Sequence, residues 1–193
     1  TINLSQLWNA LLFIARDAEQ PSVLFSCDKS KLPEMYQTDN DYATILRFAI
    51  RSALIDAVKI EGSLDEDDID DIAGQAVDLG SVPIIVIRAD QGAKADELVQ
   101  KMESRWDLEA KTFELAVPVQ TKEDIQALED AAKAFHEAHH DATVIPHPIG
   151  KIAKEAMLQG QTFGAPLLYT TDGEETETLP TSTAIHKLLH PEE

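Results

Sequence analysis

Basic residues are scarce in this chain of 193 residues. It has 16 Lys and Arg against 35 Asp and Glu, which gives a formal net charge of −19 at pH 7. A protein that grips nucleic acid must neutralise phosphates with clustered Lys and Arg, and anionic membrane surfaces attract the same basic clusters. We therefore expect no direct binding to nucleic acid and no docking on a membrane.

Cysteine and long apolar runs are scarce as well. Cys27 is the single cysteine, so an internal disulfide is excluded. It ends the run "SVLFSC", where a free cysteine commonly behaves as a small buried hydrophobe. No apolar run is long enough to cross a bilayer, and the N-terminus lacks the basic and apolar segments of a secretory signal. We expect an intracellular protein, in the cytoplasm or the nucleus.

The chain is rich in strand-like segments that alternate regularly with helix-like ones. Apolar runs typical of strands occur at 21–27, 56–62, 82–88, 111–117 and 142–148, with shorter candidates at 161–165 and 167–171. Apolar residues recur at helical spacing in 41–54, 65–80, 94–106, 121–140, 150–158 and 181–189. This alternation predicts βαβ units and a parallel sheet, either doubly wound or closed into a barrel.

Short sequence signals mark one end of each of two of these helices. Gly80 ends the segment 65–80 and suits the left-handed position that follows a helix. Thr121 and Asp124 form a variant of the capping box at the start of 121–140. No GxGxxG follows the first strand and no Walker motif occurs, so the nucleotide-binding versions of the fold lose support.

Two clusters have the residue types of metal sites. The acidic run 65–71 lacks both the Gly at position six and the Glu at position twelve that an EF-hand loop needs, and it is typical of a solvated helix N-terminus. His136, His139 and His140 have a spacing that can hold zinc, but no Cys or carboxylate completes a ligand set. They lie at an expected helix C-terminus, where histidine meets the helix dipole favourably. We expect no metal and no cofactor.

Three polar residues stand where a barrel would present its site. Glu114 interrupts the apolar run "TFELAV", Glu61 follows "AVKI" at another strand end, and His147 lies between two prolines after a strand. The carboxyl ends of barrel strands face the active site, and a charge there is costly unless it is paired. Glu61 and His147 are candidates to line the pocket of such a barrel, and the alternative for His147 is a loop residue without a role in a site.

The order of these segments resembles a known family. The stretches "PSVLFSCDKS", "SALIDAVKIEGSL", "VPIIVIRAD", "FELAVPVQTKEDIQAL", "IGKIAKEAM" and "QTFGA" followed by "DGE" are similar to those of type I 3-dehydroquinate dehydratases. The specificity lies in the series along nearly the whole chain, because no single motif is decisive. The resemblance implies a (β/α)8 barrel of the TIM type.

The resemblance also implies a covalent mechanism whose two central residues are replaced here. In the family a lysine amine forms an imine with the substrate ketone, and a histidine moves protons so that water is lost. The lysine position falls on Glu114, which has no amine, and the histidine position falls on Ala89, which transfers no proton. The resemblance therefore implies that dehydroquinase activity by the family mechanism is absent.

The positions that hold the substrate in the family have changed as well. One arginine falls on Asp28, and the following glutamate falls on Leu32. A second arginine falls on Lys154, which keeps the charge but loses the bidentate fork, and the glutamine of the closing loop falls on Glu174. We expect the added acids to oppose Lys154 and to weaken the binding of quinate or dehydroquinate.

This pattern of losses resembles the dehydroquinase-like domain of fungal quinate repressors. It implies a pseudoenzyme that restrains a transcription activator through protein contact. Two alternatives stay open. One is a barrel enzyme with altered chemistry, in which Glu61, Glu114, Glu174 and His147 supply acid and base groups. The other is a structural module that holds neighbouring domains together.

The resemblance also sets the expected extent of the domain. The family has about two further strands before "PSVLFSC", whereas this chain starts in a helix-like segment. We expect a single domain over 1–193, lacking about the first two barrel strands, within a longer multidomain chain. Such a barrel leaves strand edges open, and a homodimer is one way to cover them.

Overall fold

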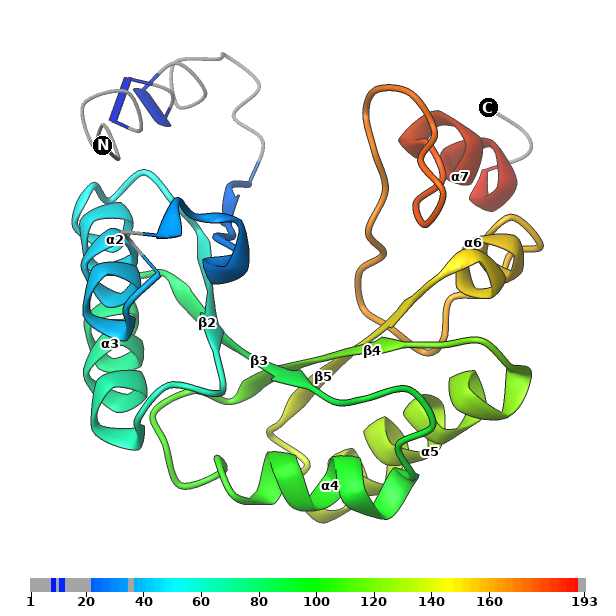
Figure 1. Ribbon diagram of the computed structural model, residues 1–193, viewed down its shortest axis with the longest axis horizontal. Coiled ribbons are helices and arrows are strands. Elements are labelled where there is room, and N and C mark those ends of the chain that lie inside the picture. Colours follow the sequence, from blue (N-terminus) through cyan, green and yellow to red (C-terminus); the bar gives the residue numbers. More distant parts are fainter. Residues whose placement is uncertain (1–7, 10, 13–21, 35–36, 191–193) are drawn as a thin grey trace. The chain divides into compact units, whose positions relative to one another are not determined.

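The computed structural model describes residues 8–9, 11–12, 22–34 and 37–190, and the chain divides into two compact units. The first unit comprises 1–86 and 105–112, and the second comprises 87–104 and 113–193. Five parallel strands follow one another in the sheet in their order along the chain (Figure 1). The helix-like start of the chain falls mainly outside the described residues.

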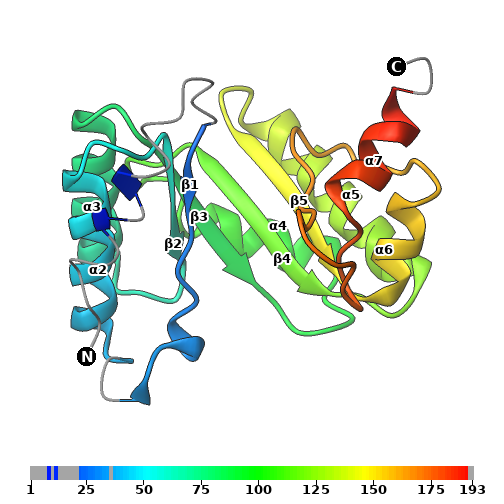
Figure 2. The ribbon, with the colours of Figure 1, turned by 90° about the horizontal axis from the view of Figure 1, so that it is seen from above.

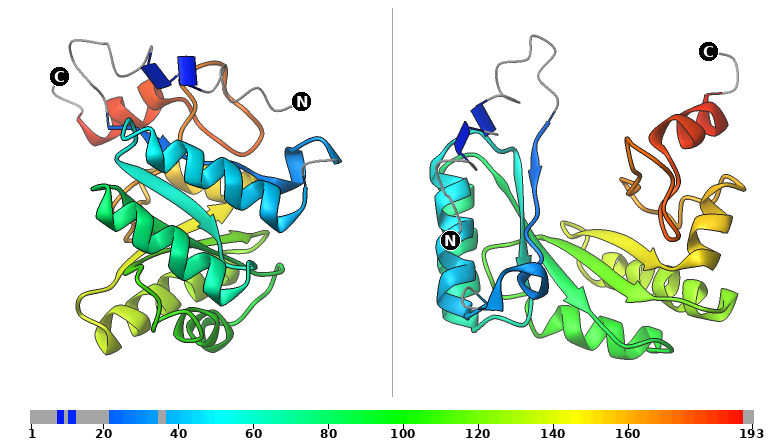
Figure 3. Two further views of the ribbon diagram at one scale, coloured as in Figure 1. Left: turned by 90° about the vertical axis from the view of Figure 1, so that its left-hand side faces the viewer. Right: turned by 45° about the horizontal axis from the view of Figure 1, so that its top comes forward.

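The first unit packs two helices on parallel strands. Its elements are β1 (Leu24–Phe25), the 3₁₀ helix η1 (Lys29–Lys31), α2 (Asp39–Arg51), β2 (Ala57–Glu61), α3 (Glu66–Asp78) and most of β3 (Val82–Arg88). Figures 1 and 3 show α2 and α3 side by side, and both contact β2. Val58 and Ile60 are fully buried while their neighbours on β2 are half-buried, as the two-residue period of a strand requires.

Side-chain caps set the helix ends in this unit. The Thr38 hydroxyl accepts the backbone N–H of Asp41, so α2 begins at Asp39, two residues before the expected start. After α3, Gly80 takes a φ of +81°, and the N–H of Ser81 bonds back to the Ala76 carbonyl. The prediction of a left-handed glycine at this helix end is confirmed.

The second unit continues the same pattern. Its elements are α4 (Ala95–Glu103), β4 (Thr112–Pro118), α5 (Lys122–Ala138), β5 (Thr143–Ile149), α6 (Lys151–Met157) and α7 (Ser182–Leu189). Figure 2 shows β4 and β5 side by side, and α4 contacts α5 on one side of them. The predicted capping box is confirmed, because Thr121 accepts from the Asp124 N–H and the Asp124 carboxylate accepts from the Thr121 N–H.

Gly150 lies at the junction of β5 and α6, where any residue with a side chain would clash. Gly150 has a φ of +147°, and an added Cβ would lie 2.6 Å from the carbonyl oxygen of Val119. The loop after β4 therefore passes directly against Gly150, and the Val119 N–H donates to the Ile149 carbonyl at 2.9 Å. This contact fixes how β4 and β5 end beside each other.

The two short strands expected at 161–165 and 167–171 do not form, apart from a single bridge between Thr171 and Thr181. The Ile149 carbonyl points toward the β4 side, so by alternation the backbone of Pro146 and Pro148 points to the open edge of β5. Proline has no N–H, and that edge lacks two of the donors that a further strand would use.

The helices of the described residues were expected not to cross a membrane. Among the residues that the structure describes, no helix has both the length and the apolar character that a bilayer span needs.

Candidate functional site

The alternation of β4 decides where Glu114 points. Phe113 packs edge to face on Phe135 of α5, with ring centroids 5.3 Å apart. Since successive side chains of a strand point to opposite faces, Glu114 points to the face away from α5. Only 2% of Glu114 is exposed. A buried carboxylate is costly unless it is paired or fully hydrogen-bonded, so its partners decide its role.

Both oxygens of the Glu114 carboxylate have a side-chain partner. Oε1 lies 2.8 Å from Nδ1 of His147, and Oε2 accepts a hydrogen bond of 2.5 Å from the Tyr169 hydroxyl. The imidazole and phenol rings also stack, with centroids 4.1 Å apart at 37°. We call these three residues the Glu114 cluster. They come from β4, from β5 and from the loop between α6 and α7, all within the second unit.

The negative charge of Glu114 decides where the protons of its two contacts sit. Burial, the negative charge of Glu114 and the hydrogen bond to it together raise the pKa of Tyr169 well above its usual range, so this phenol stays protonated and donates. An ionised carboxylate only accepts hydrogen bonds, so with Glu114 ionised the proton of the other contact sits on Nδ1 of His147. The cluster can hold and pass protons, but it has no amine that could form an imine.

A small cavity adjoins the cluster. The cavity beside His147 and Tyr169 holds only about 10 Å³, close to the least that a single water needs. Its other walls are apolar side chains and prolines: Pro146, Pro148, Met157, Phe163, Leu167, Leu168 and Leu179. This small cavity has no room for a molecule larger than a water.

The structure brings His147 within hydrogen-bonding distance of Glu114. His147 lies inside β5, within the strand expected over 142–148, and that strand extends to Ile149. Tyr169 was expected only as part of a short strand, and no motif or spacing pointed to its contact with Glu114.

Lys154 and Glu174 do not meet as expected. The Lys154 ammonium lies 2.9 Å from Glu175 and donates to the carbonyl of Thr176, which ties α6 to the loop before α7. Glu174 is exposed, and the acid that faces Lys154 is its neighbour Glu175. The loop bends so that Glu175 rather than Glu174 faces Lys154. The alternation of side chains along a strand does not predict such a bend.

The other site residues expected from the sequence, Asp28, Leu32, Glu61 and Ala89, are not members of the Glu114 cluster. Asp28 accepts from the N–H and hydroxyl of Ser30 and caps η1, while Leu32 is the C-cap of the same turn. Glu61 is the last residue of β2. Burial and the charges of Asp28 and Glu61 raise the pKa of Cys27, which fits an unreactive thiol. Ala89, directly after β3, offers only a methyl group.

The three histidines of the α5 region do not form a metal site. His136 contacts the Ala142 carbonyl through Nδ1 at 3.0 Å, and Nε2 of His139 lies 2.9 Å from Glu103. α5 ends at Ala138, so His139 is the C-cap and His140 lies beyond the helix. The described residues hold no group of three or more His, Cys, Asp or Glu side chains placed to bind a metal ion.

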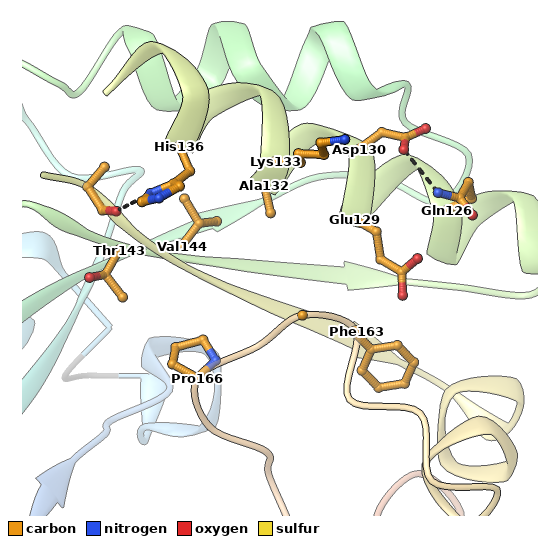
Figure 4. A pocket seen from close by; sticks show the side chains of 12 residues that line it. Gln126, Glu129, Asp130, Ala132, Lys133, His136, Thr143, Val144, Phe163 and Pro166 are labelled. Carbon is orange, nitrogen blue, oxygen red and sulfur yellow. Dashed lines mark hydrogen bonds between the residues drawn. The ribbon is translucent and has the colours of Figure 1, made fainter. Parts of the chain in front are cut away.

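A larger cavity lies elsewhere in the second unit. Figure 4 shows it between α5, the start of β5 and the loop that carries Phe163 and Pro166, and its volume is about 670 Å³. Glu129, Asp130 and Lys133 line it with mixed charge. None of the site residues expected from the sequence lies in its wall, and its floor holds no cluster comparable to the one at Glu114.

Comparison with solved structures defines the fold class. A type I 3-dehydroquinate dehydratase of Clostridium difficile matches 98% of this chain and 76% of its own, with a TM-score of 0.81 and 19% identity. The dehydroquinate dehydratase and shikimate dehydrogenase protein of S. pombe matches 96% of this chain and 35% of its own, with a TM-score of 0.71 and 13% identity. The expected (β/α)8 class is confirmed.

Comparison of sequences defines the family. The 3-dehydroquinate dehydratase of Salmonella paratyphi B is 28% identical over 134 residues, which is 68% of this chain and 53% of that enzyme. The match thus spans about half the length of such curated relatives. The sequence model of type I 3-dehydroquinase matches residues 3–192. The chain belongs to the type I 3-dehydroquinase family.

Proposed function

We propose that this chain is a non-catalytic dehydroquinase-like domain that acts by contact with a protein partner. The partner class we propose is a transcription activator of quinate utilisation, which the domain would restrain. The observation that carries the absence of catalysis is the state of Glu114: it is buried, and both of its oxygens are engaged by His147 and Tyr169.

Two chemical requirements of the family mechanism support this proposal. Imine formation needs an uncharged amine, and Glu114 at the lysine position supplies a carboxylate instead. Proton transfer needs a titrating group, and Ala89 has none. Lys154 does not replace the lost amine, because its ammonium is committed to Glu175 and the Thr176 carbonyl.

A trapping experiment tests the absence of catalysis. The protein is incubated with 3-dehydroquinate and sodium borohydride, which reduces an imine to a stable adduct that intact-mass spectrometry detects. We expect no adduct, and no turnover in a parallel reaction without borohydride, whereas the Salmonella dehydratase should give an adduct in the first reaction and turnover in the second. An adduct on this chain, or turnover above the uncatalysed rate, would reject the proposal.

The acidic surface supports a protein partner rather than nucleic acid or an anionic metabolite. With a net charge of −19, the chain favours a basic surface on its partner. Calorimetry with a purified activator of quinate-utilisation genes tests this directly. We expect binding that weakens as salt rises and no micromolar binding of quinate; a silent titration with the activator would remove the regulatory part of the proposal.

One observation favours a second candidate function, an enzyme of altered acid–base chemistry. The structure brings Glu114 and His147 within 2.8 Å, and such a pair can divide acid and base roles. A turnover screen with small polyols and hydroxy acids, run on the protein and on Glu114→Gln, separates the candidates. Turnover that disappears in the variant favours the enzyme.

A further inference from the structure

The loop segment 163–170, here named the plug segment, runs past β5 without joining the sheet. Pro146 and Pro148 leave the open edge of β5 without two ladder donors, and the structure has no strand in 163–170. A strand is held by several backbone hydrogen bonds to its neighbour. The plug segment must therefore be held by its side chains.

Tyr169 makes the polar contacts that hold the plug segment over the site. Its hydroxyl donates to Glu114 at 2.5 Å, and its ring lies on the imidazole of His147. Leu167 and Leu168 line the same small apolar cavity as Pro146 and Pro148. The hydrogen bond to Glu114 and this small apolar patch are contacts that a competing group can replace more easily than a sheet ladder.

The backbone at the start of the segment has the features of a fixed pivot. Phe163 is 3% exposed and has a φ of +58°, a conformation that non-glycine residues seldom adopt. Gly164 follows with a φ of +68°, and the Ala165 N–H closes a turn onto the Thr162 carbonyl. The chain is anchored at Phe163, and the plug segment continues from this turn.

We propose that the Tyr169 phenol is a built-in occupant of a ligand site formed by Glu114 and His147. The site accepts a ring that bears a hydroxyl group: the carboxylate takes the hydroxyl proton, the imidazole stacks on the ring, and the apolar walls enclose its edge. An anionic ring carboxylate would meet Glu114 unfavourably and is excluded. This inference goes beyond the proposed function, because it concerns what occupies the site and holds with or without a protein partner.

The charged surroundings are consistent with a neutral occupant. Glu114, His147 and Tyr169 contact one another, and the other residues that line the small cavity are apolar. An entering molecule that bears a hydroxyl group can replace the hydrogen bond that Tyr169 donates to Oε2 of Glu114, whereas a molecule without one removes that bond from a buried carboxylate.

The direct test removes the occupant and supplies it in free form. In Tyr169→Ala, p-cresol, which is the side chain of tyrosine, should bind with a Kd of about 1 mM or tighter by calorimetry or NMR. Toluene, which lacks the hydroxyl, should bind roughly tenfold more weakly. The unmodified protein should bind neither. Absence of p-cresol binding to a folded Tyr169→Ala, or equal binding by the unmodified protein, overturns the proposal.

A second variant keeps the test decisive if the larger truncation lets the plug segment collapse. Tyr169→Phe removes only the hydroxyl, and backbone amides of 165–170 should then exchange with deuterium about tenfold faster or more. Tyr42→Phe is the matched control, since it removes a hydroxyl bonded to the Lys59 carbonyl in the first unit and should leave those amides unchanged. Exchange in 165–170 that stays within twofold of the unmodified protein overturns the proposal.

Discussion

Each unit contains a cluster in which a carboxylate accepts hydrogen bonds from other side chains, and the two carboxylates differ in how exposed they are to water. In the first unit, Arg47 on α2 donates to Asp71 at 2.9 and 3.0 Å and to Asp68 at 3.1 Å on α3. The Asp71 side chain is 53% exposed there, whereas Glu114 in the second unit is 2% exposed. Water can replace a lost partner in the first cluster but not in the second, so burial decides which cluster the fold depends on.

The strongest test of this contrast removes the central charge of each cluster. Glu114→Ala leaves the Tyr169 hydroxyl and the His147 ring without their acceptor and opens a small cavity, so the free energy of unfolding should fall by about 3–5 kcal/mol. Arg47→Ala should cost about 1 kcal/mol or less. Urea denaturation measures both; equal losses would mean that burial does not separate the clusters.

A pair of glycine substitutions extends the comparison to the backbone. Gly150→Ala places a Cβ against the Val119 carbonyl at a φ of +147° and should cost about 3 kcal/mol. Gly74→Ala, inside α3 with no atom within 4 Å of the added Cβ, should stabilise by up to about 1 kcal/mol. Thermal unfolding of the two variants checks the opposite signs. A neutral Gly150→Ala would contradict the close approach.

Tyr169→Phe gives a smaller effect that depends on pH. At neutral pH the loss of a hydrogen bond to a charged acceptor should cost about 2 kcal/mol. The pKa of Tyr169 is raised in the folded protein, so its contribution is complete below the ordinary tyrosine pKa of about 10 and is lost as pH rises above it. Stability of the unmodified protein should therefore fall from pH 9 to 11 more steeply than that of the variant, as chemical denaturation at each pH would measure. Parallel pH profiles would count against the buried phenol.

The smallest effect is expected for Asp71→Asn in the first unit. Hydrogen bonds from Arg47 and then Gln75 lower the pKa of Asp71, so its contribution is present above the ordinary Asp pKa and fades as pH falls through the lowered value. Because this carboxylate is largely exposed, removal of its charge should cost less than about 1 kcal/mol, and 1 M NaCl should reduce the difference further. Urea denaturation at both salt concentrations measures this; an effect as large as that of Glu114→Ala would undo the comparison.

Most of the fold could be predicted from the sequence because the apolar periods are strong and the caps are local. The unbroken run of β3, the capping box at Thr121 and the glycine after α3 each act within a few residues, and each appears where it was expected. β1 is shorter than its apolar run suggested, because only Leu24 and Phe25 pair with β2.

The Glu114 cluster could be predicted only in part. Its position on a buried strand follows from alternation, and so does a shared face with a residue of the neighbouring strand. Tyr169 lies 55 residues from Glu114 in sequence, in a loop that no period describes, and the pairing depends on three-dimensional packing. The two prolines of β5 were a readable signal that the next segment could not pair, yet its apolar composition predicted a strand.

The prolines of β5 have a consequence for behaviour at high concentration. A sheet edge that lacks hydrogen-bond donors is a poor template for cross-β growth, in which every added chain must be held by backbone bonds from the one before it. Pro146 and Pro148 therefore protect the apolar strand that contains them from amyloid-like stacking. This protection requires no additional charged side chain beside the buried Glu114 carboxylate.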